Sequence, residues 1–102
     1  MSELFAIKLD KESQTYQVSG ELTLDTARAV MQDTETLFSA AEPIAIDLSG
    51  VTRADSAALA LVVTWMRQAN QANKRIHFQH VPNQMLAIAK ASGLDEILPI
   101  QD

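Results

Sequence analysis

Apolar and polar residues alternate in two short segments near the start of the chain. Every second residue from Phe5 to Leu9 is apolar, and Tyr16 and Val18 repeat the pattern after a polar run at 10–14. A period of two is typical of strands with one buried face. The polar run has the length of a loop between antiparallel neighbours, so the two segments predict a β-hairpin.

After Gly20 the apolar period changes to that of a helix. Apolar side chains recur at three- and four-residue spacing from Ala27 to Phe38, and Thr23 or Asp25 is expected to cap this helix. We interpret its polar face as solvated and without function. That face carries Arg28, Gln32, Asp33 and Glu35.

The rest of the chain continues as strand, helix, strand and helix. We expect a strand at 44–47, a loop at 48–55, a helix from Ser56 to about 73, a strand at 76–79 and a helix from Pro82, with an edge strand available at 97–100. Gly93 followed by Leu94 predicts a left-handed cap for the last helix. Strands joined through helices are expected to be parallel, with right-handed crossovers.

The alternation within the strands indicates that only one face of the sheet is covered. Strands covered on both faces read as unbroken apolar runs, and nearly every strand here alternates instead. We therefore predict an α/β fold, with a mixed, mostly parallel sheet, an N-terminal antiparallel hairpin and the helices packed on one face. A length of 102 residues predicts a single domain over 1–102.

Composition excludes several classes of function. Eight Lys plus Arg against thirteen Asp plus Glu give a net charge of −5, and the basic residues are scattered, so nucleic acid is not an expected partner. The start Met-Ser-Glu-Leu-Phe lacks the pattern of a leader, and the longest uncharged apolar stretch, 57–66, is shorter than the roughly 20 residues that span a bilayer. We expect a cytoplasmic protein without membrane insertion.

Residues suited to catalysis or metal binding are few. Cysteine is absent, which excludes a thiol nucleophile and a Cys-based zinc site. His77 and His80, three apart on a strand, should point to opposite faces and share no metal. Acid–base work by Asp47 and Asp55, at the two ends of one loop, is the least favoured interpretation. The sequence predicts no enzyme, metal, cofactor or small-molecule substrate.

The helix that begins at Ser56 has no polar face for two turns. Ser56 itself is explained by helix capping, since Ser is a preferred N-cap residue. One apolar stripe of the helix fits against the sheet, and Ala58, Leu61 and Trp65 form a second stripe. This second stripe either packs on a neighbouring helix or forms an exposed docking patch with Trp65 as its anchor.

The segment Asp47-Leu-Ser-Gly-Val, followed by Asp55-Ser56 at a helix start, resembles the signature of STAS domains. Gly20-Glu21-Leu22 and the segment 91–98, Ala-Ser-Gly-Leu-Asp-Glu-Ile-Leu, are similar to further segments of that family. The resemblance covers the whole chain in order. It implies the STAS fold, also found in anti-sigma factor antagonists, in which helices stack on one side of a sheet.

Within the family, the segment 59–69 and Val81-Pro82 are most similar to the STAS subunit of the Mla phospholipid-transporting ABC complexes of Gram-negative bacteria. This resemblance implies a non-catalytic cytoplasmic subunit, peripheral to the inner membrane through its complex. Such a subunit binds and supports the ATPase of a transporter that maintains outer-membrane lipid asymmetry. The alternative is an anti-sigma factor antagonist switched by phosphorylation of Ser56, although Ala57-Ala58 stand where many relatives carry Ser or Gly.

We expect the ATPase to dock on the loop at 52–56 and the first turns of the helix that follows. A neutral Ser56 near the centre suits an apolar interface, where an unpaired charge is costly. The expected partner-binding residues are Thr52, Arg53, Asp55, Ser56, Ala57, Ala58, Leu61 and Trp65.

Overall fold

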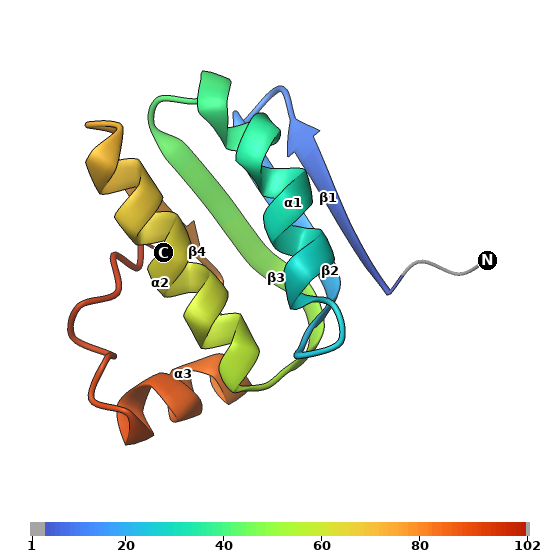
Figure 1. Ribbon diagram of the computed structural model, residues 1–102, viewed down its shortest axis with the longest axis vertical. Coiled ribbons are helices and arrows are strands. Elements are labelled where there is room, and N and C mark those ends of the chain that lie inside the picture. The colour runs from blue at the N-terminus through green and yellow to red at the C-terminus, as the bar shows by residue number, and fades with distance from the viewer. Residues whose placement is uncertain (1–3, 102) are drawn as a thin grey trace.

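The computed structural model describes residues 4–101, which form one sheet with the helices on a single face (Figure 1). The elements in chain order are β1 (Phe5–Asp10), β2 (Thr15–Leu22), α1 (Ala27–Leu37), the short 3₁₀ helix η1 (Phe38–Ala40), β3 (Ile44–Ala54), α2 (Ser56–Gln71), β4 (Ile76–Gln79) and α3 (Asn83–Ala91). Their order confirms the prediction from the hydrophobic pattern. Residues 1–3 and residue 102 lie outside the described residues. The expectation that the start of the chain is not a leader falls partly on residues 1–3. The domain bounds 1–102 stay a prediction.

The strands are ordered β1-β2-β3-β4 across the sheet. β1 and β2 form the expected antiparallel hairpin, with Ile7 opposite Val18. β2, β3 and β4 are parallel. α1 carries the chain back to the end of the sheet at which β2 began, and α2 does the same after β3. Both of these helices cross the same face of the sheet in Figure 1.

β3 is longer than the sequence predicts. A strand at 44–47 and a loop at 48–55 were expected, yet the strand continues to Ala54. Ser49-Gly50 is a typical turn sequence. The second half of β3 nevertheless pairs with β2, down to Leu22 opposite Ala54, and this pairing overrides the local turn preference.

Gly20 permits a close backbone approach between β1 and β2. Its φ of 88° lies in the left-handed region. A Cβ at this position would overlap the carbonyl oxygen of Leu4 and would lie 2.8 Å from the Cα of Phe5. Any side chain here would therefore strain the start of the hairpin.

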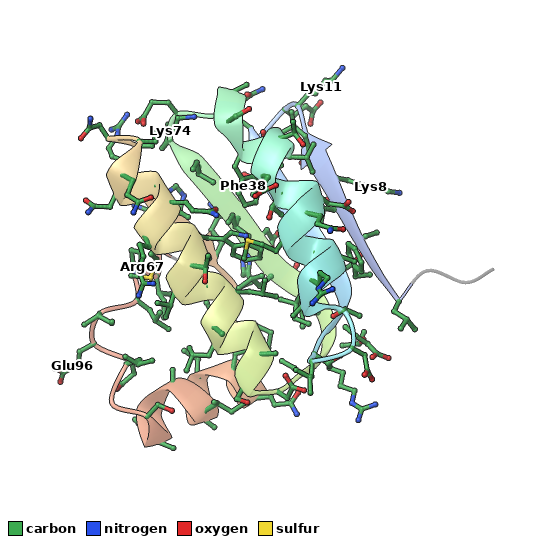
Figure 2. The ribbon with its side chains drawn as sticks, viewed as in Figure 1. Lys8, Lys11, Phe38, Arg67, Lys74 and Glu96 are labelled. Atoms are coloured by element: carbon green, nitrogen blue, oxygen red, sulfur yellow. The ribbon has the colours of Figure 1, made fainter. Side chains whose placement is uncertain are left out.

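Trp65 lies at the centre of the core, with 1% of its surface exposed. Its indole N–H donates a hydrogen bond to the hydroxyl of Thr34 on α1, at 3.0 Å. The ring of Phe38 lies edge-on at 5.6 Å between ring centres, and that of Phe78 is stacked at 6.4 Å. Figure 2 shows the Phe38 side chain among the core residues, whereas Lys8 and Lys11 project outward.

The second stripe of α2 is part of this core. Ala58 and Leu61 are 0% and 3% exposed, and Trp65 joins α2 to α1. The docking-patch interpretation is therefore wrong for these three side chains, and the stripe packs within the domain. An apolar stripe has the same sequence pattern whether a neighbouring helix or a partner covers it, which is why the sequence left both open.

The helix ends follow the predictions only in part. α1 starts after Thr26, not at Thr23 or Asp25. The Thr26 hydroxyl accepts the N–H of Thr23 and donates to the carbonyl of Glu21 in β2, so it does not cap the helix. The predicted cap at the end of α3 is confirmed, since Gly93 has a φ of 73° and the Leu94 N–H donates to the carbonyl of Ala89 at 2.8 Å. The edge strand at 97–100 is reduced to one parallel bridge between Phe78 and Ile100.

Candidate protein-docking site

Asp55 joins three elements at the carboxyl end of the parallel strands. Its Oδ1 accepts the backbone N–H of Ala57 at 2.8 Å and so caps α2. Its Oδ2 accepts the N–H of Leu24 at 3.1 Å, and its own N–H donates to the carbonyl of Leu22 at 3.3 Å. One carboxylate therefore fixes the start of α2 against the loop between β2 and α1.

Ser56 is the first residue of α2 and not its N-cap. The capping role predicted for it belongs to Asp55, one residue earlier. Ser and Asp are both preferred at this position, so their order along the chain does not show which of the two takes it. Because Asp55 provides the cap, the exposed side chain of Ser56 is available to a partner.

The other predicted docking residues divide into two groups. Thr52 and Arg53, at the end of β3, are exposed, and Ala57 is half-buried beside Ser56. Ala58, Leu61 and Trp65 are buried in the core beneath these exposed residues. The loop expected at 52–56 consists of the last three residues of β3, the linking residue Asp55 and the first residue of α2.

A groove of about 640 Å³ separates the exposed edges of α1 and α2. The two helices run in the same direction, because Leu24 contacts Asp55 at one end and Thr34 contacts Trp65 further along. Ser56 lies at the end of the groove where both helices begin. The groove is lined by Leu24, Ala27, Arg28, Met31, Gln32, Glu35, Asp55, Ser56, Ala57, Ala60, Leu61 and Thr64.

α1 also contributes to this surface, which its sequence pattern did not predict. Arg28, Gln32 and Glu35 are exposed, as the solvated-face interpretation predicts, but they also line the groove. Leu24 is 80% exposed in the loop before α1. The sequence signal for this surface is Leu24 itself, an apolar residue in a polar loop. An exposed apolar side chain beside an apolar groove extends the exposed apolar patch, and such patches mark interaction sites.

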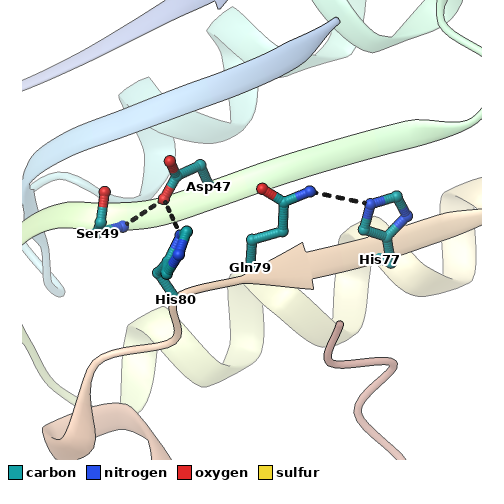
Figure 3. A network of polar contacts seen from close by, with 5 residues as sticks. All are labelled: Asp47, Ser49, His77, Gln79 and His80. Atoms are coloured by element: carbon teal, nitrogen blue, oxygen red, sulfur yellow. Dashed lines mark hydrogen bonds and ion pairs between the residues drawn. The ribbon is translucent and has the colours of Figure 1, made fainter. Parts of the chain in front are cut away.

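A second group of polar residues lies on the sheet face away from the helices (Figure 3). Asp47 Oδ1 lies 3.2 Å from His80 Nδ1 and accepts the N–H of Ser49 at 2.8 Å. His77 Nε2 lies 3.3 Å from Gln79 Nε2, and Gln79 is in register with Asp47. The prediction that the two histidines face opposite sides is wrong, because β4 ends at Gln79 and His80 has a φ of 53°, which breaks the strand alternation.

Asp47 and Asp55 have separate roles. Partial burial tends to raise the pKa of Asp47, but its hydrogen bonds with Ser49 and His80 outweigh this effect and hold the pKa below its usual value. Asp55 is engaged in capping α2. The seven strand residues between them belong to β3, so the two carboxylates do not flank a loop.

Comparison with known proteins identifies the family. The family model described as MlaB, STAS domain, matches residues 5–99. The chain belongs to the STAS-domain family. Its mixed sheet, with helices on one face and a serine at the start of α2, agrees with the resemblance found in the sequence.

Solved structures similar to this STAS domain include an MlaB subunit and an anti-sigma factor antagonist. The MlaB subunit of the Acinetobacter MlaFEDB complex, in an ATP-bound conformation, is 30% identical with a TM-score of 0.78, over 94% of this chain and 99% of that one. The anti-sigma factor antagonist SpoIIAA in its unphosphorylated form is 18% identical with a TM-score of 0.70, over 96% and 88%, and shows the fold alone. No match was found among curated proteins. None of the helices within 4–101 has the length and hydropathy that crossing a bilayer requires.

Proposed function

We propose that this STAS domain is a non-catalytic subunit that binds and supports the ATPase of an ABC phospholipid transporter, as an MlaB-like protein. It would act on the cytoplasmic side of the inner membrane, held there by its complex, in maintaining outer-membrane lipid asymmetry. The similarity to MlaB of MlaFEDB over nearly the full length of both chains supports this proposal. The observation that carries it is the exposed Ser56, fixed by Asp55 beside an open apolar groove.

The proposed contact surface comprises Thr52, Arg53, Asp55, Ser56 and Ala57. A hydroxyl can enter an apolar interface and form a hydrogen bond there at little cost. A charge in the same place loses its hydration and needs a partner. We therefore expect binding to be sensitive to charge at Ser56. The fold should tolerate an acidic group there, because negative charge is favourable at a helix N-terminus.

The test is co-purification of the chain with the ATPase subunit of the transporter from the same organism. Ser56→Glu should abolish the complex while the isolated domain keeps its melting temperature. Ser13→Glu is the matched control, since Ser13 is exposed in the turn between β1 and β2, and it should leave the complex intact. Retention of the ATPase by the Ser56→Glu variant would remove Ser56 from the interface.

A second candidate function is that of an anti-sigma factor antagonist switched by phosphorylation of Ser56. The accessible hydroxyl at the start of α2 favours it, because a phosphate there is stabilised by the helix N-terminus. The two functions predict different results when the protein is incubated with the serine kinases of its source. A single phosphate at Ser56, detected by mass spectrometry, together with release of an anti-sigma factor would favour the second.

A further inference from the structure

The groove between α1 and α2 stays open because small residues line its walls. Ala27 on α1 faces Ala57 and Ala60 on α2, and methyl groups are too short to fill the space between two helices. Met31 and Leu61 also line the groove, and Leu61 is 3% exposed, so it belongs to the floor. The result is an elongated apolar depression that follows the common direction of the helices.

The two charged side chains that α1 contributes to this groove have opposite signs. Asp55 also lines the groove, but both of its carboxylate oxygens accept backbone N–H groups. Arg28 lies near the start of α1, and Glu35 lies seven residues later on the same helix. Seven residues of α-helix correspond to about 10 Å, or two turns. The exposed Leu24 lies at the Arg28 end, next to Asp55. An occupant that matches these features is apolar on one side and carries an acidic and a basic residue about two turns apart.

We propose that this groove receives an amphipathic helix of the ATPase subunit. The acidic residue of that helix would face Arg28, and its basic residue would face Glu35. The inference rests on the proposed function, because Ser56 and Ala57 belong both to the groove and to the proposed contact surface. An apolar groove with helical walls fits a helix with anchors at i, i+3 or i+4, and i+7. A bound strand would instead need unpaired backbone groups at a sheet edge, and helices do not offer them.

The absence of cysteine from the chain makes site-specific crosslinking direct. Gln32→Cys, labelled with 4-maleimidobenzophenone, places a photoreactive group at the exposed edge of the groove without filling it, and Ala29→Cys places the same group on an exposed position of α1 that does not line the groove. After irradiation of each labelled domain with the purified ATPase subunit, only the Gln32 label should crosslink efficiently. Crosslinks from Ala29 alone would overturn the proposal.

The position and direction of the bound segment can be mapped with two further labels. Arg28→Cys and Glu35→Cys lie at the two ends of the groove on the exposed edge of α1, about two turns apart. Their crosslinks should fall in one ATPase segment, seven to eight residues apart, with apolar residues at helical spacing between them. Crosslinks to two unrelated segments would overturn the single-helix occupant. A crosslink between two copies of this chain would also overturn it, because the groove would then bind a second copy of the domain.

Filling the groove provides an independent test. Ala60→Phe should weaken ATPase binding about tenfold or more with an unchanged melting temperature, whereas Ala29→Phe should leave the affinity unchanged. Equal affinity of the Ala60→Phe and wild-type domains, with Ser56→Glu still disruptive, would overturn the groove proposal and leave the proposed function intact. Failure of the wild-type domain to bind the ATPase at all would overturn both.

Discussion

Replacing Trp65 by Ala removes the largest side chain of the core, together with the hydrogen bond from its indole N–H to Thr34. Truncation of a buried aromatic side chain to Ala costs about 3–5 kcal/mol. We expect the upper half of this range, because Trp65 is 1% exposed and contacts the rings of Phe38 and Phe78. A domain of this size is stabilised by about 5–15 kcal/mol in total, so the variant should lose between about a quarter and nearly all of its free energy of unfolding.

A double-mutant cycle separates the hydrogen bond from the packing. Thr34→Val leaves the indole N–H buried without its acceptor, which costs about 1–3 kcal/mol. The same change should cost less in a Trp65→Phe background, where no indole N–H remains. The difference between the two costs is the coupling energy, and we expect it to exceed about 0.5 kcal/mol for this contact.

Urea unfolding followed by far-ultraviolet circular dichroism measures all four proteins of the cycle. Fluorescence is unsuitable because Trp65 is the single tryptophan of the chain. A loss of less than about 1 kcal/mol for Trp65→Ala would contradict the core assignment. So would a Trp65→Phe variant that keeps its stability but loses the ATPase, because Trp65 would then act at an interface.

Three further predictions concern positions outside the core. Asp55→Ala should destabilise the domain by about 1–2 kcal/mol in urea unfolding, because it removes the cap of α2, and Asp55→Asn should cost less because it keeps an acceptor. Asp47→Asn should lower the melting temperature at neutral pH. The folded-state pKa of Asp47 is lowered, so its carboxylate stabilises the fold above the unfolded-state pKa, and the difference from wild type should vanish as the pH falls through the folded-state pKa. Gly20→Ala should lower the melting temperature more than Gly93→Ala, because both have positive φ but only Gly20 has backbone atoms where the new Cβ would lie.

The sequence predicted part of the candidate site but not the groove beside it. The pair Asp55-Ser56 predicted a helix start, and the structure begins α2 at Ser56, whose side chain is exposed. The groove beside it could not be predicted, because it depends on how far apart α1 and α2 lie and on which of their small residues face each other. Hydrophobic periodicity indicates which face of a helix is buried but not what covers it. The core position of Trp65 therefore follows only from the fold, in which its indole N–H donates to Thr34 on α1.

The sequence by itself determined the order of the elements, the hairpin, the parallel strands and the glycine cap of α3, because each follows from a local period or from the φ requirement of a single residue. The tertiary structure decided the rest. Pairing with β2 extends β3 through the turn-like Ser49-Gly50. Asp55 caps α2 through the N–H of Ala57 and also accepts the N–H of Leu24, so the side chain of Ser56 is not needed as a cap. The pairing of β3 with β2 and the contact of Asp55 with Leu24 both join residues that are distant along the chain and adjacent only in the fold, and such tertiary contacts outweigh local preference.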